Sequence, residues 1–243
     1  MIRVKLVLAY DGTAFHGWQM QENAVTVQGV LQDALFELFG KKITVSGCSR
    51  TDAGVHAKTF VCHFDLEKAF PLEKLPLALN ALLPGDVAVK WAEQVNSDFH
   101  ARFSCKGKTY RYRLWNARIR DPFEAKRAGF WPIPLNADHM NEVAQDFVGR
   151  HDFRAFMASG SNIKSTVREI YSFRVYREGD RIDFVVSGNG FLYNMVRIMV
   201  GTLIYADLGK LDRTIPEILS QGDRTLGGIT VVPQGLYLET VEY

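Results

Sequence analysis

The order in which strand-type and helix-type hydrophobic patterns follow one another limits the folds open to this chain. In its first half, short stretches alternate apolar and polar residues as strands do, and two longer stretches place apolar residues at helical spacing. The predicted order is strand, helix, strand, strand, helix, strand. These elements cover residues 3–9, 25–39, 43–46, 59–64, 71–83 and 87–93. This order is typical of the ferredoxin-like arrangement, an antiparallel sheet with two helices on one face.

The second half of the chain gives the same order of elements. No residue-level repeat accompanies it, so the duplication rests on element order alone. We therefore predict an α+β protein with two tandem ferredoxin-like halves, 1–105 and 106–243, each with an antiparallel sheet. The elements of the second half cover residues 109–115, 137–148, 166–177, 181–187, 192–206 and 236–241.

Positive charge is concentrated in one stretch, although the whole chain carries a net charge of only +2. Between Arg102 and Arg127 there are nine basic and two acidic residues, a net charge of +7, which leaves −5 for the rest of the chain. A lone basic run is more often a solvated face, but this one also contains aromatic residues that stack well on bases. It therefore favours binding to a polyanion such as RNA. The aromatic residues are Phe103, Tyr110, Tyr112 and Trp115.

Several other classes of protein are disfavoured by the composition. No apolar run approaches the roughly 20 residues that span a bilayer. Three cysteines without a C-x-x-C pair suggest neither a disulfide framework nor a zinc knuckle. Neither a G-x-G-x-x-G nor a P-loop motif is present, and the sequence shows no metal-ligand cluster. We expect a cytoplasmic protein that needs neither metal nor cofactor and does not bind a membrane.

A polar loop between two predicted strands is the first candidate site. It places Asp52 between Arg50 and His56 in the string Ser49–His56. Loops on rigid scaffolds often carry catalytic groups. Asp-Ala-Gly is also an ordinary turn string, and a histidine is more often structural than catalytic. The residues alone therefore leave both a turn and a catalytic role open for Asp52.

Two further segments carry candidate functional groups. In the strongly apolar predicted helix that follows Asn189, Arg197 must reach solvent, snorkel or pair with a carboxylate, for which Asp52 is the natural candidate. Such a pair would lower the pKa of the aspartate and keep it ionised. In the strand 108–113, alternation puts Tyr110 and Tyr112 on one face and Arg111 and Arg113 on the other. Packing is the default for at least one tyrosine, and the residues leave open the alternative that a tyrosine at a sheet end stacks on an extruded base.

Seven blocks, in order along nearly the whole chain, resemble those of the TruA family of tRNA pseudouridine synthases. Together they are highly specific, although any one of them would be weak. Two small departures are visible, because Ser49 stands where many members have Gly and Asn194 where His is frequent. The blocks are Tyr10–Thr13, Phe15–Gln19, Ser49–Ala57, Phe99–Ser104, Lys108–Tyr112, Phe191–Arg197 and Gly235–Leu238.

The resemblance implies an isomerisation, in which the N-glycosidic bond of a uridine is broken and C5 of the rotated uracil is joined to the ribose. Asp52 is then the catalytic carboxylate, acting covalently on the uracil or the ribose or promoting a glycal intermediate. Arg197 pairs with it, Tyr110 stacks on the base and is a candidate to take the C5 proton, and Leu236 packs against the ring. Arg50 fills the space left by the displaced nucleotide or holds phosphate.

The resemblance also implies a substrate and an assembly. Members of the family act on uridines 38, 39 and 40 of the tRNA anticodon arm as homodimers, with the tRNA bridging both subunits. A positively charged active-site cleft between the two halves is expected, with Lys106, Arg111 and Arg113 among its RNA contacts. Two rival classes remain open: a non-catalytic RNA-binding protein on ferredoxin-like sheets, and a hydrolase using Asp52 with a second carboxylate.

Overall fold

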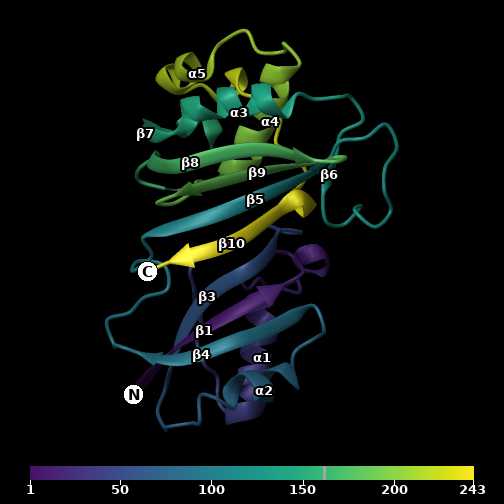
Figure 1. Cartoon of the computed structure of the whole chain (residues 1–243). Helices are drawn as coiled ribbons and strands as arrows, with labels where there is room; N and C mark the ends of the chain where they lie inside the picture. Colours follow the sequence, from purple (N-terminus) through teal and green to yellow (C-terminus); the bar gives the residue numbers. More distant parts are fainter. Residues whose placement is uncertain (161–162) are drawn as a thin grey trace. The chain divides into compact units, whose positions relative to one another are not determined.

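The computed structural model describes residues 1–160 and 163–243, which form two compact units (Figure 1). The first unit comprises Met1–Lys106 and Tyr237–Tyr243, and the second comprises Gly107–Leu236. Each contains helices and a sheet whose long strands are antiparallel, which confirms the predicted α+β class. Among the described residues, no helix has both the length and the apolar composition needed to cross a bilayer.

The sheet of the first unit has the strand order β4-β1-β3, with the short strand β2 also paired to β3. The central strand β1 is antiparallel to both neighbours. Its alternate residues Val4, Leu6 and Leu8 are fully buried, as the period of a half-buried strand requires. The elements are β1 (Ile2–Tyr10), α1 (Val27–Phe39), β2 (Ser46–Gly47), β3 (His56–Leu66), α2 (Leu75–Asn80) and β4 (Val87–Val95).

The last strand of the chain, β10 (Leu236–Glu242), runs parallel to β3. The pairs are Tyr237 with His56 and Leu238 with Ala57. The sequence pattern predicts this strand in the second half, but from Tyr237 onward it belongs to the first unit. A local hydrophobic pattern predicts that a strand exists and does not identify the strand with which it pairs.

The second unit has the strand order β5-β9-β8-β7, and the short strand β6 pairs with β5. Helix α3 packs on β8 and on α4, and Figure 1 shows both helices with α5 on one side of this sheet. The strands are β5 (Gly107–Trp115), β6 (Gly129–Phe130), β7 (Gly149–Asp152), β8 (Val167–Glu178) and β9 (Arg181–Gly188). The helices are α3 (Ala137–Ala144), α4 (Met195–Asp207) and α5 (Ile215–Gln221).

The largest errors of the sequence analysis concern short elements. The predicted strand 43–46 is reduced to the two-residue β2, and the predicted helix 71–83 to the six-residue α2. The short elements β6, β7 and α5 were not predicted, because strands of two to four residues hold too few positions to show alternation. The sequence did contain a signal for α5, namely a capping box at Thr214 with Glu217 and a left-handed glycine at its end, Gly222.

Candidate active site

The loop that carries Asp52 is held on both sides by backbone hydrogen bonds to the segment after β1. Before the aspartate, the Trp18 N–H donates to the Thr51 carbonyl at 3.1 Å. After it, the Gly54 N–H donates to the Phe15 carbonyl at 3.2 Å. Asp52 itself is half-buried, and its loop leads directly into β3. A rigid platform thus presents this carboxylate.

Two glycines make this close approach of the two loops possible. A Cβ added at Gly12 would lie 2.0 Å from the Val55 carbonyl oxygen, and one added at Gly17 would lie 2.4 Å from that of Thr51. Gly17 also has a φ of +85°, a conformation that other residues rarely adopt. The first two family-like blocks of the sequence therefore support the loop of the third.

His56 has a structural position beneath the same loop. The side chain is 1% exposed, its ring stacks on Tyr237 at 4.6 Å, and its Nδ1 accepts the Gly12 N–H at 3.0 Å. The Asp11 carboxylate lies 3.1 Å from the same nitrogen. Of the two roles left open by the sequence, this geometry favours the structural one.

Arg197 lies on the first turn of α4 and is half-buried. Its Nε donates to the Val231 carbonyl at 2.7 Å, and its Nη1 donates to Asn194 Oδ1 at 2.7 Å. These two bonds fix the plane of the guanidinium group, because its donors have a rigid geometry. The predicted pairing of Arg197 with Asp52 stays a prediction.

The alternation predicted for β5 is confirmed. Tyr110 is 6% exposed and Tyr112 fully buried, while Arg111 and Arg113 lie on the other face with about a quarter of their side chains exposed. Tyr112 has a packing role, because its hydroxyl donates to the Val232 carbonyl at 3.0 Å and burial raises its pKa well above the usual value. Tyr110 remains the candidate for base stacking.

The two arginines of β5 share a buried carboxylate that the sequence analysis missed. Asp183 is 3% exposed and lies 3.1 Å from Arg111 Nη1 and 3.5 Å from Arg113 Nε. Arg111 also donates to the Tyr176 hydroxyl at 2.7 Å. Tyr176 and Asp183 thus satisfy part of the hydrogen-bonding capacity of Arg111, and Arg113 forms an ion pair with the same carboxylate. The register that pairs Arg113 with Asp183 across the strands was needed to find this cluster.

The remaining predicted site residues lie at the ends of elements. Arg50 is exposed, two residues before Asp52. Lys106 is also exposed, and its backbone N–H donates to the Glu242 carbonyl at 2.8 Å. Leu236 is 6% exposed at the start of β10. The first unit therefore carries Arg50, Asp52 and Lys106, and the second carries Tyr110, Arg111, Arg113, Arg197 and Leu236.

A family model described as tRNA pseudouridine synthase matches residues 6–104 and 143–243. The chain belongs to this family. It is 49% identical to tRNA pseudouridine synthase A of Ruminiclostridium cellulolyticum and 46% identical to that of Thermoanaerobacter sp. strain X514, and each alignment covers 100% of both chains. A solved structure described as "Crystal Structure of a Cbf5-Nop10-Gar1 Complex" is 13% identical and covers 97% of this chain and 57% of its own, with a TM-score of 0.41. That score is too low to support a structural conclusion.

The family match covers some of the predicted site residues and not others. Asp52 and Arg50 lie within its first range, and Arg197 and Leu236 within its second. The strand β5, with Tyr110 and its neighbouring arginines, lies between the two ranges. The relatives match across this gap, because their alignments cover the whole chain.

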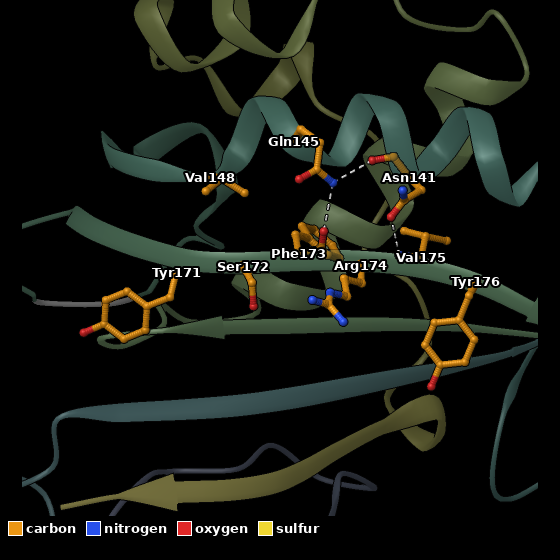
Figure 2. A pocket seen from close by; sticks show the side chains of 9 residues that line it. All are labelled: Asn141, Gln145, Val148, Tyr171, Ser172, Phe173, Arg174, Val175 and Tyr176. Atoms are coloured by element: carbon orange, nitrogen blue, oxygen red, sulfur yellow. Dashed lines mark hydrogen bonds between the residues drawn. The ribbon is translucent and has the colours of Figure 1, made fainter.

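A groove beside β8 is lined by none of the predicted site residues. It measures about 480 Å³ and is lined by residues of α3, of the turn that follows α3, and of β8 (Figure 2). At its floor, Gln145 Nε2 donates to the Phe173 carbonyl at 2.9 Å, and the Val175 N–H donates to Asn141 Oδ1 at 2.9 Å. Strand β7 pairs only with residues 167–170 of β8, so these amides occupy the sheet edge beyond it. We interpret the groove as a protected strand edge.

Proposed function

We propose that this pseudouridine synthase converts uridines 38, 39 and 40 in the anticodon stem-loop of tRNA to pseudouridine, with Asp52 as its catalytic carboxylate. The observation that carries the proposal is the fixed loop of Asp52. Backbone hydrogen bonds hold the loop on both sides of the aspartate, and the neighbouring segment approaches it so closely at Gly12 and Gly17 that neither position has space for a side chain. Catalysis rewards such preorganisation, because a catalytic group held in position loses little entropy when it reacts.

The reaction exchanges one bond of the ribose for another. The bond from C1′ to N1 of uracil breaks, the bond from C1′ to C5 forms, the C5 hydrogen leaves as a proton and N1 gains one. Asp52 acts on the uracil or the ribose, or promotes a glycal intermediate, and Arg197 keeps its carboxylate ionised at neutral pH. The two hydrogen bonds that orient the Arg197 guanidinium support this role.

The remaining residues bind the extruded nucleotide. Tyr110 stacks on the uracil and takes the C5 proton, and Leu236 packs against the ring. The position of the Tyr110 ring, 5.1 Å from that of Phe191 and nearly perpendicular to it, supports a fixed aromatic surface. Arg50 fills the space that the flipped base leaves or holds phosphate, for which its exposure is suitable.

The tRNA backbone is bound by the basic stretch of the chain in a positively charged cleft, and the active form is a cytoplasmic homodimer. Lys106 is exposed, as a contact between its ammonium group and phosphate requires. Arg111 and Arg113 contact RNA while Asp183 fixes their orientation, so their contribution to the net positive field is smaller than their number suggests. The dimer rests on the resemblance to the family.

Replacing Asp52 by Asn tests the proposal. The amide has almost the volume of the carboxylate and can keep a turn hydrogen bond, so the variant should fold and bind tRNA as the parent does. Tritium release from tRNA labelled at C5 of uracil should fall to background, because an amide is neither a nucleophile nor a base here. Filter binding and a melting curve on the same preparation provide the controls.

The same assay separates the rival functions. Isomerisation releases tritium to water, binding alone releases none, and hydrolysis frees uracil. A parent protein that binds tRNA without releasing tritium is a non-catalytic RNA-binding protein. An Asp52→Asn variant that turns over at the parent's rate would remove this carboxylate from the mechanism.

A further inference from the structure

The N-cap residue of α4 has an uncommon conformation and an uncommon partner. Among the described residues, Asn194 is the one non-glycine with a positive φ, +59°, a region that asparagine tolerates better than most residues. An asparagine at an N-cap usually accepts a backbone N–H of its own helix. The Asn194 side chain makes no such capping bond, and its Oδ1 accepts the Arg197 Nη1 at 2.7 Å instead.

The second acceptor of Arg197 belongs to a loop that is pressed against α4. A Cβ added at Gly201 would lie 1.9 Å from the Ile229 carbonyl oxygen, and one added at Gly228 would lie 2.4 Å from that of Gly201. Neither position has space for a side chain. The loop backbone and the helix backbone are therefore in direct contact at Gly228. This contact lies three residues before Val231, whose carbonyl accepts the Arg197 Nε.

A buried threonine fastens the same loop to the helix. Thr202 is fully buried, and its hydroxyl donates to the Ile198 carbonyl at 2.8 Å and accepts the Gly228 N–H at 2.9 Å. A hydroxyl that both donates and accepts in a dry environment is fixed in orientation. The position of the Val231 carbonyl is thus set by the helix whose arginine it binds.

From these contacts we propose that Asn194 and Thr202 are positioning residues of the synthase. Asn194 orients the Arg197 guanidinium directly, and Thr202 does so by fixing the loop 227–232 and its Val231 carbonyl. Both act through Arg197 and neither contacts the reacting atoms. The inference rests on the catalytic role proposed for Arg197.

Asn194→Gly and Asn194→Asp separate the acceptor from the backbone conformation. Glycine adopts a φ of +59° freely but removes the oxygen, whereas aspartate tolerates that φ and keeps an oxygen in place. We expect the single-turnover rate of tritium release at saturating tRNA to fall about 10-fold in Asn194→Gly, because one hydrogen bond to a charged group is lost. Asn194→Asp should recover most of the rate, and tRNA affinity should change little in both.

Thr202→Val and Thr202→Ser make the same comparison for the hydroxyl that fastens the loop 227–232 to α4. Valine keeps the shape of threonine and removes the hydroxyl, while serine keeps the hydroxyl and removes a methyl group. We expect the rate to fall in Thr202→Val and to be largely restored in Thr202→Ser. Asn141→Ala is the matched control, because it removes an amide that accepts the Val175 N–H in the same unit without touching Arg197 or its acceptors. It should lower the melting temperature and leave the rate unchanged.

The outcomes distinguish this inference from the proposed function. If Asn194→Gly and Thr202→Val lower only the melting temperature, as Asn141→Ala does, and keep the parent's rate, the inference is overturned. An Arg197→Met variant tests the premise, since methionine keeps much of the side-chain volume but neither the charge nor the planar fork. Full activity of Arg197→Met would overturn the role proposed for Arg197, and the inference with it. Loss of activity in Arg197→Met with normal rates in the other two variants would overturn the inference alone.

Discussion

Replacing Gly17 by alanine should slow catalysis roughly 100-fold in addition to lowering stability. The new Cβ would lie 2.4 Å from the Thr51 carbonyl oxygen, and real Cβ contacts below 3.0 Å essentially do not occur. The Asp52 loop must therefore move by about 0.6–1 Å to restore an ordinary contact. A displacement of about 1 Å at a catalytic group costs roughly 100-fold in rate. The positive φ of +85° adds about 1–2 kcal/mol to the cost in stability.

Gly40→Ala provides the matched control for this experiment. Gly40 ends α1 with a φ of +70°, so alanine there has a similar conformational cost, but no atom lies within 4 Å of the added Cβ. Denaturant unfolding gives the stability of both variants, and single-turnover tritium release on tRNA gives the rate at a temperature where both are folded. If Gly17→Ala and Gly40→Ala lose similar stability and both keep the parent's rate, the contact does not position a catalytic group.

Three further predictions concern pH, salt and the sheet edge. Burial, with smaller contributions from neighbouring positive groups, lowers the His63 pKa from 6.5 to about 4. Between pH 6.5 and 4 the unfolded chain therefore binds a proton at His63 that the folded protein does not bind. The free energy of unfolding should fall by up to about 3 kcal/mol as the pH drops across this range. His63→Gln should flatten this part of a urea-unfolding series. Lys106→Ala should reduce the slope of log tRNA affinity against log salt by about one, and an unchanged slope would place Lys106 away from phosphate. Replacing Asn141 and Gln145 by alanine should lower the free energy of unfolding by about 1–2 kcal/mol each, because the strand edge of Figure 2 loses its amide partners. The exposed edge should also increase self-association, measured by light scattering. A double variant as stable and monodisperse as the parent would contradict this.

The long elements of the fold were predictable because their periodicity extends over many residues. The predictions for β1, α1, β5 and β9 differ from the observed bounds by two residues or fewer at each end. Predictions failed where tertiary contacts determine the outcome. Residues Ile43 and Val45 are buried, as their apolar side chains suggest, but pairing with β3 begins only at Ser46. The parallel pairing of β10 with β3 likewise depends on residues 181 positions apart.

The candidate site was partly predictable for a different reason. Asp52 and Arg197 are charged residues in otherwise constrained segments, and such residues attract attention in any sequence. Asp183 did not, because an aspartate in a half-polar strand is unremarkable until cross-strand register places it beside Arg113. Tyr112 matched the pattern of a base-stacking residue as well as Tyr110 did, and its packing role follows only from the structure, in which its hydroxyl donates to the Val232 carbonyl.

The supports of the two proposed catalytic groups share one physical property. The loop of Asp52 is held by the backbone of Phe15 and Trp18, and Arg197 by the backbone carbonyl of Val231. A substitution cannot delete a carbonyl or an amide N–H, except by proline, so such supports are insensitive to most changes in the residues that provide them. They are sensitive to anything that separates the paired backbones, such as a side chain at Gly17 or Gly228. We therefore expect these two glycines to constrain activity alongside the charged residues, and a relative with both charges but a larger residue at either glycine should bind tRNA and turn over slowly.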